Sequence, residues 1–417
     1  MKKLMILFWT GMTFMLPALE IKPADGEFVR EIGDKVSFRI VLGKERANAK
    51  FKVLVKADRY LSGEHQLAAD LNGEAVIDLF PTRPGFIFVE AADLNKRAVC
   101  TIAVTPELLR PGRRMPKSFN RYWNKVRREL DLHPVQYEIS ELSGAKSGFR
   151  AYDVRIQMPD RMQNVYAILT MPLDAIPGRV PAMVMFYGFG VDKVSPVYRK
   201  NMMILTVNPV PVKNEGKMGE TFLENGQFFN SMYSGMADIK ENIFAGMFAR
   251  AFRAVQFIKT MPEWDQRTLI TYGTRVGGAQ AVAAAGFDPQ VSMCAAFAPA
   301  LCNHGGYDNG GESGWPQYHL DTEVYPEQTD KVLGVVDHVD ICFFGMRIRN
   351  ATVYMTAGYL DQQCLPSSVT ALYNVIRSEN KTLRAEPELD HRIPTKFYRE
   401  ASALIDAHVL ERQEDIL

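Results

Sequence analysis

The sequence predicts an α/β protein, with a mostly parallel sheet covered by helices on both faces, preceded by a small all-β domain. Two patterns along the 417-residue chain support this prediction. Between about residues 20 and 105, short segments alternate apolar and polar residues, which is the period of half-buried strands. From about residue 131 onward, apolar runs alternate with amphipathic stretches, which is typical of parallel strands connected by helices.

The N-terminus, MKKLMILFWTGMTFMLPALE, has the pattern of a secretory signal peptide. Two lysines precede the apolar stretch from Leu4 to Leu16, and small residues such as Ala18 follow it. This stretch is shorter than the ~20 residues that span a membrane, although an uncleaved anchor stays an alternative. We therefore expect residues 1–19 to be removed and the protein to be secreted or periplasmic, without a membrane span after cleavage.

A β-sandwich of the Ig-like kind is predicted over residues 20–105. Its expected strands are KVSFRIVL, FKVLVKA, AVIDLF, GFIFVEA and AVCTIAV, separated by turn residues. This domain has two alternative roles: it packs beside the next domain, or it contacts carbohydrate. The segment PELLRPGRRMPKS follows, and its three prolines predict a linker over residues 106–120.

Residues 121–417 carry the α/β pattern. FNRYWNKVRRELDL and FAGMFARAFRAVQFIKTM have apolar residues at helical spacing. YDVRIQM and VYAILTMP alternate and predict an antiparallel pair, whereas VPAMVMFYG and MMILTVN are apolar runs typical of buried central strands. TLITY, VSMCAAFAP and ATVYMTAG predict further strands, GAQAVAAAG predicts a helix, and the last helix is expected from Pro394 to Glu411.

Composition excludes some classes of partner. The formal net charge is +1 and charged residues make up 23% of the chain, so the sequence gives no reason to expect nucleic-acid binding. The five cysteines include no C-x-x-C pair, and no H-E-x-x-H motif is present. We therefore expect neither a metal site nor a cofactor.

The stretch TYGTRVGGAQ carries the strongest chemical signal. Gly273 and Gly277 flank Arg275 with the spacing of the G-x-S-x-G turn, which presents a nucleophile between a strand and a helix. Asp361 follows a later strand, and His391 precedes the last helix. A nucleophile position, an acid and a histidine in this order predict an α/β-hydrolase domain.

Several blocks between Arg121 and the C-terminus resemble the acetyl xylan esterase and cephalosporin C deacetylase family of α/β-hydrolases. The similar segments are FNRYWNKVRREL, VMFYGFGVD, PEWDQRTLITYGTRVGGAQAVAAAGFDPQV, AGYLDQQCLPSSVTALYN and PELDHRIP. The resemblance implies deacetylation of acetylated carbohydrates, with Asp361 and His391 as acid and base. It also implies an oxyanion hole from the backbone N–H groups of Val276 and Phe189. Because this family tends to assemble, a homo-oligomer is kept open.

Arg275 departs from the family at the nucleophile position, where serine is expected. A guanidinium stays protonated and offers no acceptor lone pair, so it cannot replace a serine hydroxyl. The Arg275 side chain could point in two directions. Toward Asp361, it would pair with that carboxylate and hold it away from His391; toward the pocket, it would form an anion-binding group. Cys302 and Cys364 are the thiols considered as substitute nucleophiles.

The segment NHGGYDNGGESGWPQY follows a strand at the edge where such sheets bind ligands. Trp315, Tyr307 and His304 are candidates to contact a sugar, and a loop packed on its own aromatic residues is the alternative.

The leading hypothesis is a family member with impaired or lost esterase activity that binds an acylated carbohydrate or another small molecule. The alternatives are an active carbohydrate esterase with another nucleophile, and a non-catalytic scaffold that binds carbohydrate or protein.

Overall fold

The structure is a computed structural model of the chain. It describes residues 19–57, 61–159, 162–188, 194–214, 235–318 and 329–414. The predicted signal peptide, apart from Leu19, and the predicted oxyanion residue Phe189 lie outside the described residues. The chain divides into two compact units, one up to Arg83 with Ile87–Val104, and one comprising Pro84–Phe86 and the chain from Thr105 onward.

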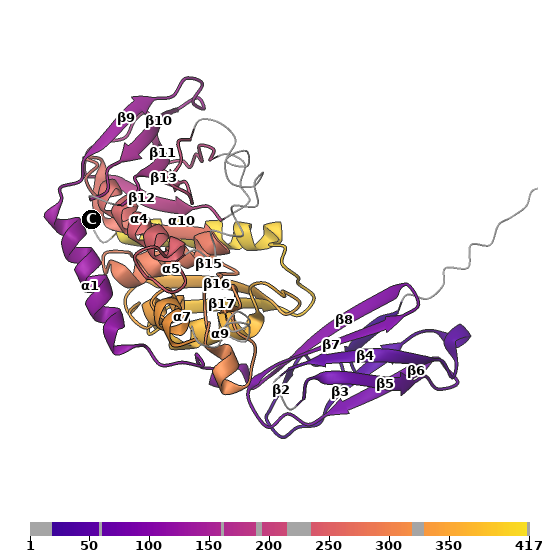
Figure 1. The fold of residues 1–417 in the computed structure, drawn as a ribbon. Coiled ribbons are helices and arrows are strands. Elements are labelled where there is room, and N and C mark those ends of the chain that lie inside the picture. Colours follow the sequence, from indigo (N-terminus) through magenta and orange to yellow (C-terminus); the bar gives the residue numbers. More distant parts are fainter. Residues whose placement is uncertain are drawn as a thin grey trace, which may run out of the picture. The chain divides into compact units, whose positions relative to one another are not determined.

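The first unit contains two β-sheets (Figure 1). One sheet has the order β1 (Glu20–Pro23), β3 (Val36–Val41), β6 (Glu74–Leu79), with antiparallel neighbours. The other has the order β2 (Val29–Arg30), β8 (Lys96–Val104), β7 (Gly85–Asp93), β4 (Lys50–Lys56), β5 (Gly63–Ala68). A short 3-10 helix, η1 (Lys44–Arg46), precedes β4.

The two sheets share one apolar core. Along β3, Val36, Phe38 and Ile40 are fully buried while the residues between them are half-buried. Val53 and Val55 of β4 join them in the same cluster. The period-two pattern read from the sequence therefore corresponds to the inward faces of a sandwich.

The second unit is built on a nine-stranded sheet. Its order is β17 (Lys381–Glu386), β16 (Thr352–Gly358), β15 (Met293–Phe297), β14 (Trp264–Thr274), β12 (Val180–Phe186), β13 (Met203–Val207), β11 (Val165–Pro172), β10 (Phe149–Ile156), β9 (Tyr137–Glu141). Strands from β17 to β13 pair in parallel, and β11, β10 and β9 are antiparallel. Among the predicted strands, YDVRIQM and VYAILTMP form the expected antiparallel pair.

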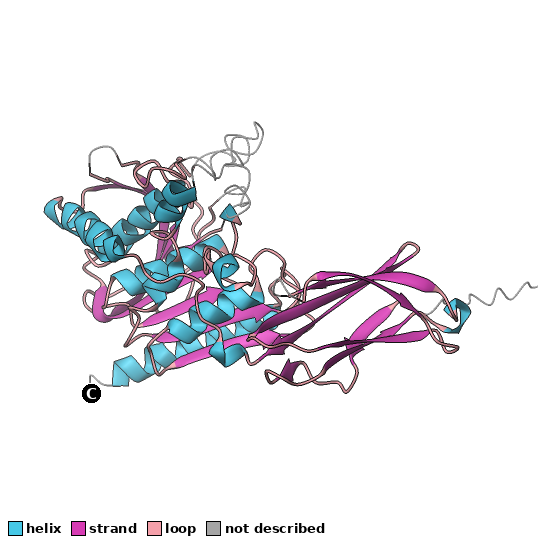
Figure 2. Cartoon of the chain, turned by 60° about the horizontal axis from the view of Figure 1, so that its bottom comes forward, coloured by secondary structure: helices cyan, strands magenta, loops and turns pink. Residues whose placement is uncertain are grey.

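Helices cover both faces of this sheet (Figure 2). The helical elements are α1 (Lys117–Leu132), α4 (Ile243–Ile258), α5 (Val276–Phe287), α7 (Thr329–Val336), α8 (Ile341–Gly345), α9 (Pro366–Val375), α10 (Thr395–Glu414), η2 (Pro106–Leu108) and η3 (Gly306–Asn309). Residues of α1, α4, α5, α8 and α9 share one core with one face of the sheet. Phe397, Ala401 and Ile405 of α10 pack against the opposite face. The fold is therefore a three-layer α/β arrangement, as the sequence predicts.

Strand β12 lies at the point where the strand order reverses, because it pairs in parallel with β13 on one side and β14 on the other. Ligands of open α/β sheets bind beside such a point, at the carboxyl ends of the strands. The candidate site therefore belongs at the ends of β12 and β14. Among the described residues, no helix has the length and apolar content that crossing a membrane requires.

Candidate active site

Arg275 occupies a sharp turn between β14 and α5. It is the residue before Val276, the first residue of α5, and its backbone angles are φ 53° and ψ −115°. L-amino acids rarely adopt this region, so the conformation is strained and must be held by its surroundings. This is the strand-to-helix geometry that presents a nucleophile in α/β-hydrolases.

The flanking glycines make the turn sterically possible. A Cβ atom built on Gly273 would lie 2.2 Å from the carbonyl oxygen of Gly277. One built on Gly277 would lie 2.1 Å from the carbonyl oxygen of Phe186, the last residue of β12. The chain therefore requires glycine at both positions, because backbone atoms occupy the space that a side chain would need.

Backbone hydrogen bonds hold Arg275 on three sides. Its N–H donates to the carbonyl of Phe297 at 2.9 Å, and its own carbonyl accepts from Ala279 at 2.9 Å and from Ala300 at 3.1 Å. The end of β15, the first turn of α5 and the following loop thus all fix the main chain. These contacts do not depend on the side chain, so the turn keeps its form with arginine in place of serine.

The predicted acid and histidine are brought together. Asp361 follows β16, is 1% exposed, and accepts hydrogen bonds at Oδ1 from the backbone N–H groups of Gln363 and Cys364, both at 2.8 Å. His391 lies between β17 and α10, and its Nδ1 is 3.0 Å from each carboxylate oxygen of Asp361. We call Asp361 and His391 the acid–base pair.

This geometry sets the orientation of the imidazole. A carboxylate can only accept, so Nδ1 carries a proton and Nε2 is the nitrogen left to face a ligand. The His391 side chain is 29% exposed, whereas that of Asp361 is 0% exposed. The acid–base pair therefore has the arrangement in which a buried carboxylate positions a histidine that solvent and ligand can reach.

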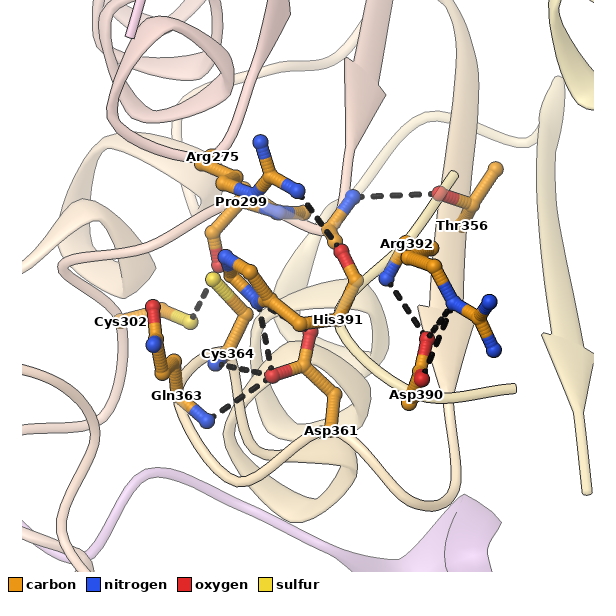
Figure 3. Close-up of polar contacts among 11 residues, drawn as sticks. Arg275, Pro299, Cys302, Thr356, Asp361, Gln363, Cys364, Asp390, His391 and Arg392 are labelled. Carbon is orange, nitrogen blue, oxygen red and sulfur yellow. Dashed lines mark hydrogen bonds and ion pairs between the residues drawn. The ribbon is translucent and has the colours of Figure 1, made fainter. Parts of the chain in front are cut away.

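The Arg275 side chain does not pair with Asp361. Its Nη2 donates to the backbone carbonyl of His391 at 2.8 Å (Figure 3). The alternative in which the guanidinium draws Asp361 away from His391 is therefore wrong, because Asp361 is already satisfied by His391 and by its own loop. Arg275 Nε is buried without a hydrogen-bond partner within the described part of the chain.

Tyr398, in the first turn of α10, also lies within electrostatic range of the guanidinium. Burial raises the pKa of the Tyr398 hydroxyl, and the charge of Arg275 lowers it against this trend. The sequence does not single out Tyr398, whose ring lies 4.9 Å from that of Phe297 at the end of β15. At neutral pH the hydroxyl is a neutral donor beside the cation.

One of the two predicted oxyanion donors is described. Val276 opens α5, and the first N–H groups of a helix have no acceptor within that helix. A Cβ built on Gly188 would lie 3.9 Å from the Val276 nitrogen, so the chain leaving β12 passes beside this N–H group. The roles of Val276 and Phe189 stay predictions.

The loop after β15 places the three aromatic candidates differently. His304 is buried, its N–H donates to Asp340 at 2.8 Å, and burial lowers the pKa of its imidazole, so it belongs to the interior. Trp315 is half-buried and packs edge-on against Phe244 at 6.0 Å. Tyr307 lies in η3 and is half-buried. Sugar contacts by Trp315 and Tyr307 stay predictions, and the position of His304 does not favour one.

The thiols near the site are poor nucleophiles. Cys302 and Cys364 are 2% and 4% exposed. Burial raises the pKa of both thiols well above the usual value, and the carboxylate of Asp361 adds to this increase. Because the thiolate is the reactive form, these positions do not favour a cysteine as the substitute nucleophile.

The same argument bears on metal binding. Ligand atoms of Asp361, Cys364 and His391 lie within 4.8 Å of one another, which would permit a metal ion. A metal needs the Cys364 thiolate, however, and would have to displace the hydrogen bonds that Asp361 accepts. The guanidinium of Arg275 adds a positive charge beside Cys364. The three residues therefore fit an acid–base pair better than a metal centre.

A parallel sheet with this turn and this acid–base pair defines the class of α/β-hydrolases. The chain belongs to the acetyl xylan esterase family, whose family model, Acetyl xylan esterase (AXE1), matches residues 107–406. It is 27% identical over 328 residues to the acetyl esterase Axe7A of Xylanibacter ruminicola, covering 75% of this chain and 72% of that protein.

Two solved structures share the fold of about three quarters of the chain. The acetyl xylan esterase from Paenibacillus sp. R4 superimposes with a TM-score of 0.62 at 20% identity, covering 72% of this chain and 98% of that one. Acetyl xylan esterase 1 from Thermoanaerobacterium sp. JW/SL YS485 superimposes with a TM-score of 0.60 at 20% identity, covering 73% and 97%. The family and the α/β-hydrolase fold predicted from the sequence are thereby confirmed.

Proposed function

We propose that this protein is a member of the acetyl xylan esterase family that has lost most or all ester hydrolysis and retains its site for binding a carbohydrate-derived ligand. One observation carries the proposal: the residue at the nucleophile turn is Arg275, which has no hydroxyl or thiol to attack a carbonyl carbon. Removal of the serine from such a triad costs about a million-fold in turnover.

The surrounding geometry supports retention of a binding site. The acid–base pair stays hydrogen-bonded at 3.0 Å, and the guanidinium contacts the His391 carbonyl rather than the Asp361 carboxylate. The alternative, an active esterase with another nucleophile, receives no support from Cys302 or Cys364, because burial keeps both thiols protonated. A role as a pure scaffold would leave the ordered acid–base pair without a use.

The test is a comparison of the wild-type protein with His391→Ala on an activated acetyl ester such as 4-nitrophenyl acetate. We expect both proteins to hydrolyse the ester at the same low rate, because no nucleophile depends on His391. Wild-type turnover that His391→Ala abolishes would contradict the proposal and show a functional base. A melting temperature measured for both proteins controls for loss of fold.

We also propose that the protein is exported, on the basis of the lysine-led apolar stretch from Leu4 to Leu16. Expression of the full chain in a bacterial host, followed by fractionation and N-terminal sequencing, tests this. A mature N-terminus near residue 20 in the periplasm or medium is expected, whereas a chain that retains Met1 in the cytoplasm would contradict it.

A further inference from the structure

We propose that Arg275 makes this site a receptor for a carboxylate anion, carried either by an acidic sugar or by a free short-chain acid. The inference rests on the proposed function, since it assigns a ligand class to a site without hydrolysis. A guanidinium presents a planar fork of N–H donors that matches the two oxygens of a carboxylate. Arginine at the nucleophile position thus exchanges a covalent function for an electrostatic one.

Among the described residues, Arg275 forms no ion pair with a carboxylate. Its hydrogen bond within them is to a neutral acceptor, the His391 carbonyl at 2.8 Å. The nearby carboxylate of Asp361 already accepts from His391 and from two backbone N–H groups. A half-buried cation with a neutral partner gains from an anionic ligand, because charge-assisted pairs are the stronger hydrogen bonds.

The half-buried arginines of this chain have either a neutral or a charged partner. Arg127 and Arg347 donate to neutral oxygens of Phe287 and Asn120, whereas two others face a carboxylate. Arg46, with 31% of its side chain exposed, pairs with Asp93 at 2.6 Å. Arg113, with 26% exposed, lies 3.1 Å from Asp337. Each of these last two cations therefore faces a carboxylate of the protein itself. Arg275 differs from them in lacking such a partner within the described part of the chain, at a position where the fold binds ligands.

The start of helix α5 adds positive potential beside Arg275. The twelve-residue helix α5 begins directly after Arg275, and its first turn carries no acidic residue. The partial positive charge at a helix N-terminus favours an anion. Figure 3 shows one terminal nitrogen of Arg275 turned to the His391 carbonyl and the other directed away from the acid–base pair.

The experiment is isothermal titration calorimetry on the full chain with four probes: D-galacturonate, D-glucuronate, sodium acetate and neutral D-xylose. We expect saturable binding of at least one carboxylate probe at millimolar concentration and none of D-xylose. Preference for the uronates would identify an acidic sugar as the source of the carboxylate. Equal binding of acetate would identify a short-chain acid.

Arg275→Gln removes the charge while retaining a polar side chain. We expect it to weaken carboxylate binding by about 10- to 100-fold, the range for a hydrogen bond to a charged group. Arg392→Gln is the matched control, because Arg392 follows His391 directly but is 87% exposed and pairs with Asp390. It should change the affinity less than about two-fold, as expected for an exposed pair.

Three results would overturn the inference: no saturation with any carboxylate, equal binding of D-xylose, or unchanged affinity in Arg275→Gln. If that variant does not fold by circular dichroism, Arg275→Lys takes its place. This variant keeps the positive charge without the paired N–H donors of a guanidinium, and it should bind the carboxylate more weakly than wild type.

The ester assay distinguishes the two proposals. Hydrolysis that depends on His391 contradicts the proposed function, whereas absent carboxylate binding together with absent hydrolysis contradicts only the carboxylate inference.

Discussion

The nucleophile turn and the acid–base pair lie in the same site but have diverged to different degrees. The acid–base pair has both side chains predicted as acid and base, with Nδ1 of His391 at 3.0 Å from Asp361. The turn retains its glycines and its backbone angles, φ 53° and ψ −115°, but carries Arg275. The backbone of the turn is specified by steric contacts, whereas its chemistry depends on one hydroxyl group, so the chemistry can be lost while the form persists.

The largest effect is expected from restoring the serine. Arg275→Ser should raise turnover on 4-nitrophenyl acetate by about a thousand-fold or more over wild type, because the acid–base pair is already in place. Steady-state kinetics of the two proteins measure this. The double variant with His391→Ala should return to the wild-type rate. A serine variant that stays inactive would show that the acid–base pair, too, has lost its function.

The second prediction tests the claim that the turn is specified by steric contacts. Gly277→Ala places a Cβ 2.1 Å from the Phe186 carbonyl oxygen and should destabilise the protein by roughly 3 kcal/mol. Urea denaturation followed by circular dichroism measures the free energy of unfolding. Gly334→Ala in α7 is the control, because its Cβ meets no atom within 4 Å. It should be neutral or stabilise by about 0.5 kcal/mol.

The third prediction concerns the acid–base pair. Asp361→Asn should lower the free energy of unfolding by about 1 to 2 kcal/mol, because the buried hydrogen bond from His391 loses the charge of its acceptor. Asp390→Asn removes an exposed carboxylate that pairs with Arg392, and it should cost less than about 0.5 kcal/mol. Equal costs for the two variants would mean that the acid–base pair adds no stability beyond that of a surface pair.

The smallest effect is expected for the thiols. Burial raises the pKa of Cys302 and Cys364 well above the usual value, so both should react with a disulfide reagent only after unfolding. Labelling in native buffer and in guanidinium chloride, read by mass spectrometry, measures this. Cys302→Ala and Cys364→Ala should leave ester hydrolysis unchanged. Rapid native labelling of either thiol would revive the alternative of a substitute nucleophile.

The fold was predictable where burial leaves a period in the sequence. The segment expected to begin at Val165 is β11 without change, and β3, β4, β6, β7 and β8 lie within two residues of their predicted segments. The prediction missed β1, β2, β5, β9 and β17. Strand β9 is exposed at every position and β5 at most of them. A strand without a buried face gives no alternation of apolar and polar residues.

Other boundaries depended on contacts distant in sequence. Strand β14 begins at Trp264, earlier than the apolar run TLITY, because Trp264 pairs with Val180 across an irregularity in register. The last helix begins at Thr395, close to the predicted Pro394, but extends to Glu414 beyond the predicted Glu411. Terminal turns of helices are decided by local hydrogen bonds that composition does not reveal.

The sequence by itself determined the family, the order of turn, acid and histidine, and the presence of arginine at the turn where serine is expected, because motif spacing and periodicity are properties of the chain read in order. Only the tertiary structure decided what Arg275 does. Its partner, the His391 carbonyl, lies 116 residues further along the chain. The choice between that carbonyl and the Asp361 carboxylate depended on hydrogen bonds that Asp361 makes elsewhere. A side chain finds its partner according to which groups folding leaves unsatisfied, and that is a property of the assembled site.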